Sequence, residues 1–256
     1  MQQSIPKPTK YPSTIDHTLL TAILAAIILG FSKAGFKGIS FLTVTLMALA
    51  YGGKVSTGIL LPMLIFADIF AILYYRKDVN WRILFRLFPA MAVGIVIGTF
   101  VGKELSLEVF KQVMAGIIFL SGIMILLMGR INTDKISKHP VFAIVMGLSA
   151  GFCTMVGNLA GAFANIYFLA MQLPKRAFIG TAAWLFFFVN IFKLPFHIFV
   201  WQTITPSTFL QNLHLFPFIL VGFGIGVKLI EKFSDAFYKQ YIIFMTLLGA
   251  VLILLK

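Results

Sequence analysis

The sequence contains one hydrophobic unit twice, which restricts the chain to a fold built from two similar halves. The best evidence is a constant spacing in the later part of each unit. The matched positions are Ala34-Gly35-Phe36 with Ala150-Gly151-Phe152, Gly58 with Gly180, Asp68 with Asn190, and Pro89, Gly94 and Gly98 with Pro217, Gly222 and Gly226. A duplicated apolar unit with small and polar residues at matched places is typical of secondary transporters, whose substrate lies between the repeats.

The composition is that of a membrane protein. Of the 256 residues, 60% are hydrophobic and 11% are charged, whereas a soluble domain carries about 25% charged residues. The formal net charge of +13 comes from basic residues dispersed on loops between apolar runs. We therefore expect membrane topology, and not nucleic acid binding, to account for the charge. The single cysteine, Cys153, allows no internal disulfide and is expected to be a packing residue.

Six apolar runs are long enough, or nearly so, to cross a hydrocarbon core of about 30 Å. They are Val55–Tyr75, Trp81–Val101, Gln112–Met128, Ala177–Val200, Leu213–Val227 and Gln240–Leu255. Two pairs of shorter runs remain, Leu19–Phe31 with Ile39–Ala50 and Val141–Ser149 with Leu159–Met171, and a glycine-bearing break divides each pair. A helix of about 12 residues rises only about 18 Å, so each pair is predicted to form a broken hairpin that ends near mid-membrane. Four short tilted spans are the alternative.

These elements predict an all-α, polytopic transmembrane helix bundle of two repeats, each a broken helical hairpin plus three long spanning helices. The predicted divisions are a polar N-terminal tail over residues 1–18, a first repeat over 19–128, a basic connecting loop over 129–140 and a second repeat over 141–256. No convincing cleavage site follows the first apolar run, so no signal peptide is expected.

The loop charges predict that the two repeats have opposite orientations. The loop Arg76–Arg86 carries four basic residues, whereas the matched loop Trp201–Asn212 has no charged residue. Because basic loops stay in the cytoplasm, the first loop is predicted to be cytoplasmic and the second external. Both termini are then expected outside.

Three segments resemble the sulfite exporter TauE/SafE family. They are Ser32-Lys33-Ala34-Gly35-Phe36-Lys37-Gly38, then Asp78-Val79-Asn80-Trp81 ahead of the span with Pro89, Gly94 and Gly98, and the stretch Gly151 to Gly161. The resemblance covers about Leu19 to Leu255. It implies a multi-pass protein of the inner membrane that exports or takes up sulfite, sulfoacetate or a related small sulfur-containing anion. The commoner family pattern has clustered glycines and a proline after the first break. This chain has Ile39-Ser40-Phe41-Leu42-Thr43 there, which leaves the particular substrate open.

The two breaks have the features of an anion site. A dehydrated anion in hydrocarbon needs positive partners and backbone donors, which helix N-termini supply. A helix is predicted to begin after each break, near Ile39 and near Leu159. The predicted substrate-binding residues are Gly35, Lys37, Gly38, Gly157, Asn158, Gly161, Asn190 and Lys193. The alternatives are that the lysines reach an aqueous surface as loop charges and that the glycines serve close helix packing.

Asp68 is the one acidic residue deep inside an apolar span. A carboxylate there usually faces a cavity or a partner, so we expect Asp68 to be a proton-coupling group or the counter-ion of Lys37 or Lys193, with a purely structural ion pair as the alternative. Asn190 occupies the matched position, where a substrate contact and an interhelical hydrogen bond both remain open. Lys193 follows one helical turn later, and His197, one further turn along, is expected to lie at the membrane interface.

Aromatic residues need no binding role in this interpretation. The run Phe186-Phe187-Phe188 is expected to form lipid-facing and packing surface. Trp81 and Trp201 stand at span ends, where interfacial anchoring accounts for them.

The sequence has no phosphate-binding Gly-rich loop, no metal-ligand spacing and no assembly of nucleophile and base. We therefore expect no cofactor, no metal site and no catalytic residue. The expected partners are a small inorganic or organosulfur anion, membrane lipid and, if Asp68 titrates, a coupling proton. The rival functions are a membrane-embedded enzyme acting on lipid and a non-transporting membrane scaffold.

Overall fold

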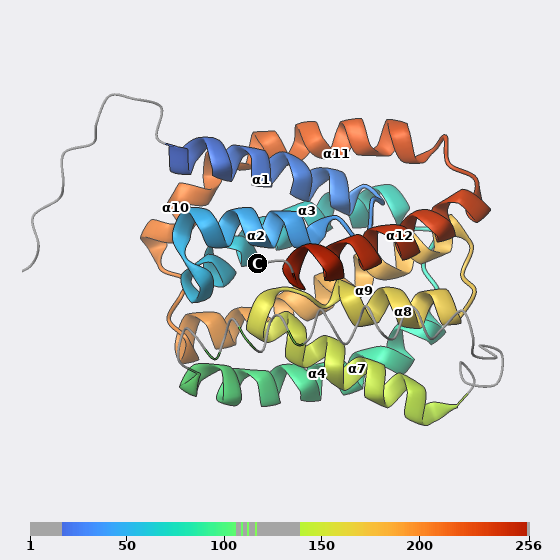
Figure 1. The fold of residues 1–256 in the computed structure, drawn as a ribbon, viewed down its shortest axis with the longest axis horizontal. Coiled ribbons are helices and arrows are strands. Elements are labelled where there is room, and N and C mark those ends of the chain that lie inside the picture. Colours follow the sequence, from blue (N-terminus) through green and yellow to red (C-terminus); the bar gives the residue numbers. More distant parts are fainter. Residues whose placement is uncertain (1–16, 106–108, 110–111, 113–115, 117–138, 255–256) are drawn as a thin grey trace, which may run out of the picture.

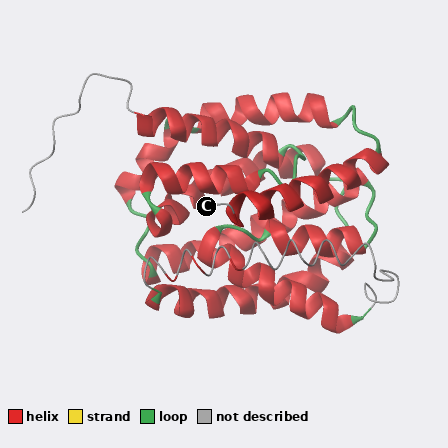
Figure 2. Cartoon of the chain, in the orientation of Figure 1, coloured by secondary structure: helices red, strands yellow, loops and turns green. Residues whose placement is uncertain are grey.

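The computed structural model describes residues 17–105, 109, 112, 116 and 139–254 (Figure 1). Within these residues the chain forms helices, turns and loops and contains no strand (Figure 2). The predicted all-α fold is therefore confirmed. The tail through residue 16, nearly all of the predicted span 112–128 and the connecting loop through residue 138 lie outside the described residues.

The described helices form two groups along the sequence. The first group is α1 (His17–Lys33), α2 (Ser40–Tyr51), α3 (Gly53–Tyr75) and α4 (Trp81–Glu104). The second group is α7 (Pro140–Gly157), α8 (Gly161–Ala170), α9 (Lys175–Pro195), the π-helix η1 (Phe196–Val200), α10 (Pro206–Leu213), α11 (Phe216–Ile230) and α12 (Asp235–Leu254). Among the described residues, four helical stretches are long and apolar enough to cross a membrane, namely Val55–Tyr75, Trp81–Glu104, Pro140–Gly157 and Lys175–Val200.

Two helix boundaries differ from the sequence prediction. The apolar run expected to end at Ser149 continues through the glycine-rich stretch, so that α7 reaches Gly157 and has 18 residues. Gly151 lies inside this helix because it packs against the backbone of Met91, where a side chain would not fit. The run predicted over Leu213–Val227 is shifted, because Leu213 ends α10 and the next helix, α11, covers Phe216–Ile230.

Three helix pairs organise the bundle. In Figure 1, α1 lies along α11 at one edge and α4 lies along α7 at the opposite edge, with α3 and α9 packed between them. Glycines permit the edge contacts. A Cβ on Gly94 of α4 would overlap the carbonyl oxygen of Leu148, and a Cβ on Gly222 of α11 would overlap that of Ile27. These are the close backbone approaches that small residues allow between membrane helices.

The edge contacts also revise the alignment of the two halves. Gly98 faces the backbone of Phe152, and its counterpart Gly226 faces the backbone of Phe31. These contacts equate Phe31, rather than Phe36, with Phe152, so that Lys37 corresponds to Asn158. The sequence alignment at Ala34-Gly35-Phe36 is thus out of register with the packing, while the duplication itself stays a prediction.

Helices α3 and α9 run in opposite directions. Arg176, at the start of α9, contacts Asp78 just after α3 through an Nε–Oδ2 distance of 3.3 Å. At the other end of the pair, Gly58 near the start of α3 packs against Thr203, which follows η1. A Cβ on Gly58 would overlap Thr203. The basic loop after α3 and the uncharged loop after η1 therefore lie at opposite ends of this helix pair. Their placement on the two membrane faces stays a prediction.

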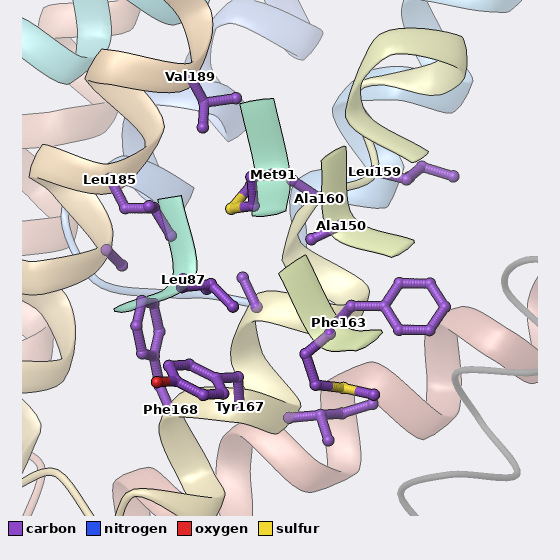
Figure 3. Close-up of a cluster of buried hydrophobic side chains, with 14 of the residues drawn as sticks. Leu87, Met91, Ala150, Leu159, Ala160, Phe163, Tyr167, Phe168, Leu185 and Val189 are labelled. Carbon is purple, nitrogen blue, oxygen red and sulfur yellow. The ribbon is translucent and has the colours of Figure 1, made fainter. Parts of the chain in front are cut away.

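A hydrophobic core holds the second break in place. Figure 3 shows side chains from α4, α7, α8 and α9 gathered around the break at Leu159 and Ala160. The labelled members of this core are Leu87, Met91, Ala150, Leu159, Ala160, Phe163, Tyr167, Phe168, Leu185 and Val189. Because all ten are buried, the start of α8 is packed rigidly against the rest of the bundle.

Candidate functional site

A polar cavity lies between the two breaks. Its lining residues come from both breaks and from the middle of α3 and α9, and they are Ser32, Lys33, Lys37, Gly38, Ser40, Leu64, Thr154, Asn158, Ala160, Gly161, Asn165, Phe186 and Asn190. The space open to the centre of a water molecule is about 40 Å³. One water needs about 10–15 Å³ on this measure, so the cavity holds a few waters or one small ion.

Two helix N-termini meet at this cavity. Ser40 is the first residue of α2 and Gly161 is the first residue of α8, and both line the cavity. Neither helix has a side-chain cap. The first-turn N–H groups of a helix have no acceptor within that helix and carry a partial positive charge. The arrangement therefore directs two sets of backbone donors at one small space, as anion binding requires.

Lys37 brings a basic side chain into the cavity. Its side chain is 4% exposed, and its Nζ makes no hydrogen bond to any described residue. The ammonium lies 5.7 Å from the ring centroid of Phe186. The adjacent Gly38 has φ = 100°, a left-handed conformation that favours glycine. Because a buried ammonium without a partner is costly, Lys37 is the group in the cavity that most needs a bound anion.

Asp68 is the counter-ion of Lys33. The Nζ of Lys33 lies 2.5 Å from Oδ1 of Asp68, and both side chains are buried. Asn190 donates from Nδ2 to Oδ2 of Asp68 at 2.7 Å. The expectation that Lys37 or Lys193 would pair with Asp68 is therefore wrong. Lys33 is the last residue of α1 and lies inside the bundle, although the sequence places it beside a glycine break.

Lys193 is fully buried behind the cavity wall. Its Nζ donates to Oδ1 of Asn158 at 2.5 Å and to Oγ1 of Thr154 at 3.3 Å. Asn158 in turn donates from Nδ2 to the carbonyl oxygen of Thr57 at 3.2 Å. Both polar ends of the Asn158 amide are thus engaged within the protein. These contacts hold the second break against α3 and α9. Asn158 also lines the cavity, and its contact with the substrate stays a prediction.

Gly35 and Gly157 do not line the cavity. Gly157 is the last residue of α7. Gly35 has φ = 139°, and a Cβ there would lie 2.8 Å from Cδ1 of Ile179 and 2.9 Å from Cγ1 of Ile230. These two isoleucines border a second cavity of about 200 Å³, which also includes Tyr74, Tyr75, Lys175, Arg176 and Glu231. Gly35 therefore packs against two residues that line the second cavity.

Two tyrosine hydroxyls hold the first break closed at Gly35. Tyr75 of α3 donates to the carbonyl oxygen of Ala34 at 2.6 Å, and Tyr238 of α12 donates to that of Gly35 at 2.9 Å. Carbonyls at the end of a helix lack intrahelical donors, so these hydroxyls satisfy them. No sequence pattern indicates this contact, because the tyrosines lie far from the break along the chain.

Phe186 faces the cavity. Its ring centroid is 5.1 Å from Nζ of Lys33 and 5.7 Å from Nζ of Lys37. Phe186 packs against the core, as expected, and also lines the cavity, which was not expected. The ring face attracts cations. Sequence reasoning also missed Ser32, Ser40, Thr154 and Asn165. Hydroxyl residues are common packing residues in membrane helices, but an asparagine in an apolar stretch was a usable signal.

His197 and Trp201 are buried within the protein, while their level in the membrane stays a prediction. His197 is 0% exposed, and its Nδ1 is 2.8 Å from Oγ1 of Thr203. Trp201 is buried and donates from Nε1 to the carbonyl oxygen of Thr99 at 2.9 Å. The span ends where these residues lie are packed against α4, which the sequence did not indicate.

The family comparison agrees with this architecture. A model of the sulfite exporter TauE/SafE family matches residues 20–253. The chain belongs to this family. TauE/SafE proteins are membrane anion transporters and not enzymes, and with its apolar helices this chain is an integral membrane protein. Searches of curated proteins and of solved structures found no match. Among the described residues, no cluster of His, Cys, Asp or Glu is placed to hold a metal ion.

Proposed function

We propose that this TauE/SafE protein is an inner-membrane transporter of a small sulfur oxyanion, with sulfite as the first candidate, and that the anion binds in the cavity between the two breaks. The substrate class, a small anion, is inferred from the family. The proposed binding position rests on Lys37, because its buried Nζ has no hydrogen-bond partner among the described residues. A bound oxyanion would accept from this ammonium and from the N–H groups at the starts of α2 and α8.

The size of the cavity favours the smallest family substrates. With about 40 Å³ open to the centre of a water molecule, the cavity suits an ion of a few heavy atoms. Sulfite fits this description better than sulfoacetate, whose two charged groups are joined by a carbon. Sulfoacetate remains the second candidate, since a transport site widens and narrows during its cycle.

The membrane potential favours export. Moving one negative charge out of a cell with an inside-negative potential is favoured by about 2.3 kcal/mol per 100 mV. Export therefore needs no coupling ion, whereas uptake does. Asp68 is held by Lys33 and Asn190, so its first role in the proposed cycle is to neutralise Lys33. A coupling proton on Asp68 is a separate proposal, which the gradient experiment in the Discussion tests.

A counterflow screen tests the proposal. Purified protein is reconstituted in liposomes loaded with unlabelled sulfite, and entry of labelled sulfite is followed with external thiosulfate, sulfate, sulfoacetate or acetate as competitors. We expect internal sulfite to accelerate entry, and liposomes without protein to show no acceleration. Absence of exchange with every small anion would contradict the proposed function.

A further inference from the structure

We infer that the site selects doubly charged oxyanions over singly charged ions of the same shape, and that Lys193 sets this preference without touching the anion. The inference rests on the proposed function, and it names the valence of the substrate. It depends on the count of buried charges around the cavity and on the contacts that each charge makes.

The buried charges do not balance. Among the described residues, the buried lysine, arginine and acidic side chains are Lys33, Lys37, Asp68 and Lys193. Lys33 and Asp68 neutralise each other at 2.5 Å. Neither Lys37 nor Lys193 lies within salt-bridge distance of a described carboxylate. With its lysines protonated, the region around the cavity therefore carries two uncompensated positive charges.

The two uncompensated lysines differ in what they contact. Lys37 lines the cavity and has no hydrogen-bond partner among the described residues, so it is placed to donate to the anion directly. Lys193 donates to Thr154 and Asn158, and it is these two residues that line the cavity. Its hydrogen bonds are to neutral oxygens, which leave its charge uncompensated. Lys193 thus stands one side chain away from the anion.

A positive charge one side chain away from the anion still raises the affinity for the anion strongly. Charges several ångströms apart in a protein interior interact with an effective dielectric constant near 20, so each charge on the anion gains roughly tenfold or more in affinity from one such cation. A singly charged ion would leave one of the two positive charges without a counter-charge in a membrane interior, which is unfavourable. A doubly charged ion balances both.

The small cavity requires both charges on one compact group. An ion with two charged ends joined by a chain would satisfy the charge count but exceed the space of about 40 Å³. Sulfite in its doubly charged form, sulfate and thiosulfate meet both conditions. Methanesulfinate and methanesulfonate have nearly the shapes of sulfite and sulfate, but a methyl group replaces one oxygen and removes one charge.

These isosteric pairs provide the experiment. Labelled sulfite is bound to the detergent-purified protein near neutral pH, because the inference requires protonated lysines. Sulfite is compared with methanesulfinate, and sulfate with methanesulfonate, as competitors. We expect each doubly charged ion to compete at least about tenfold better than its singly charged partner. Equal competition within each pair would overturn the inference while leaving the proposed function intact. Failure of labelled sulfite to bind at all would contradict both.

Variants distinguish the electrostatic effect of Lys193 on the anion from the effect of its hydrogen bonds within the protein. Lys193→Met should weaken binding of the singly charged ions by about tenfold and of the doubly charged ions by about a hundredfold, so that the ratio within each pair falls by about tenfold. Thr154→Val removes one acceptor of Lys193 and keeps its charge, so the ratio should persist. An equal loss for both valences in Lys193→Met would overturn the role assigned to Lys193. Should that variant fail to fold, the ratios measured on the unmodified protein still decide the preference.

Discussion

Asn190 donates a hydrogen bond of 2.7 Å from Nδ2 to Oδ2 of Asp68, and this contact joins the centres of α3 and α9. The two residues occupy matched positions in the sequence alignment. Asp68 also binds Lys33 of α1, so three helices meet at one carboxylate. Polar contacts of this kind hold membrane helices together where the surrounding lipid gives no hydrophobic driving force.

Asp68→Asn should destabilise the protein because it leaves the ammonium of Lys33 without a counter-charge. Breaking a buried ion pair by removing one partner costs about 3–5 kcal/mol. The double variant Asp68→Asn with Lys33→Met should recover most of this loss, since no unpaired charge remains. Thermal unfolding in detergent measures both effects, and additive losses in the double variant would contradict the pairing.

The same carboxylate allows a test of proton coupling. If Asp68 carries a coupling proton, Asp68→Asn should abolish the dependence of anion flux on a pH gradient and leave anion-for-anion exchange partly intact, because a neutral amide imitates only the protonated carboxyl group. Gradient-driven uptake and exchange are measured side by side in liposomes. A variant that retains gradient dependence excludes the coupling role.

Much of the fold follows from the sequence, because long apolar runs have few alternatives in a membrane protein. The break before α2 and the span of α3 were predicted within a few residues. The end of α7 was not, since glycine signals both a break and a close helix contact. At Gly151 only the neighbouring backbone of Met91 decides between them.

The site was predictable where a polar residue interrupts apolar sequence. Asp68, Lys37 and Asn190 stand out for this reason. The partner of Asp68 was not predictable, because Lys33 and Lys37 border the same break and only the structure shows which of them reaches Asp68. Phe186 was missed because three consecutive phenylalanines cover several faces of a helix, and the sequence does not show which of them faces the cavity.

Gly94→Ala and Gly222→Ala should each destabilise the bundle. Either new methyl group would overlap a carbonyl oxygen of the neighbouring helix, and overpacking costs about 1–3 kcal/mol. Gly224 in α11 is a matched control, because nothing lies within 4 Å of its Cβ position. Gly224→Ala should be neutral or stabilising by up to about 1 kcal/mol. Equal unfolding temperatures for the three variants would be inconsistent with the packing of α4 on α7 and α1 on α11.

Tyr75→Phe and Tyr238→Phe should loosen the first break. Each change removes a hydroxyl donor from a carbonyl oxygen of the break, and a buried acceptor left without a partner costs about 1–3 kcal/mol. The larger effect is expected for Tyr75→Phe, because the carbonyl oxygen of Gly35 also accepts from the N–H of Lys37 at 2.7 Å. A cysteine at Ser40, in a background with Cys153→Ala, should then react faster with a polar thiol reagent. Tyr167→Phe is the control, because the Tyr167 hydroxyl has no partner among the described residues. Equal reactivity in all three variants would contradict the conclusion that Tyr75 and Tyr238 hold the first break closed.

The two loops at opposite ends of the α3–α9 pair should lie on opposite sides of the membrane. Single cysteines at Lys77 and Ser207, both exposed positions, are labelled in intact cells with a reagent that does not cross the inner membrane. We expect Ser207→Cys to react and Lys77→Cys to react only after the membrane is opened, because basic loops stay in the cytoplasm. Reaction of both from outside would contradict the inverted arrangement.

Sulfite exchange by Lys37→Gln tests the central claim most directly, because Lys37 is the cation assigned to the anion. Trans-stimulated exchange of labelled sulfite is measured in liposomes for the unmodified protein and for Lys37→Gln, together with the unfolding temperature of each. Loss of a hydrogen bond to a charged group removes about 1.5–3 kcal/mol, so we predict at least a tenfold loss of exchange. The unfolding temperature should stay equal or rise, since an unpaired buried charge is removed. Exchange by Lys37→Gln at the rate of the unmodified protein would contradict the account.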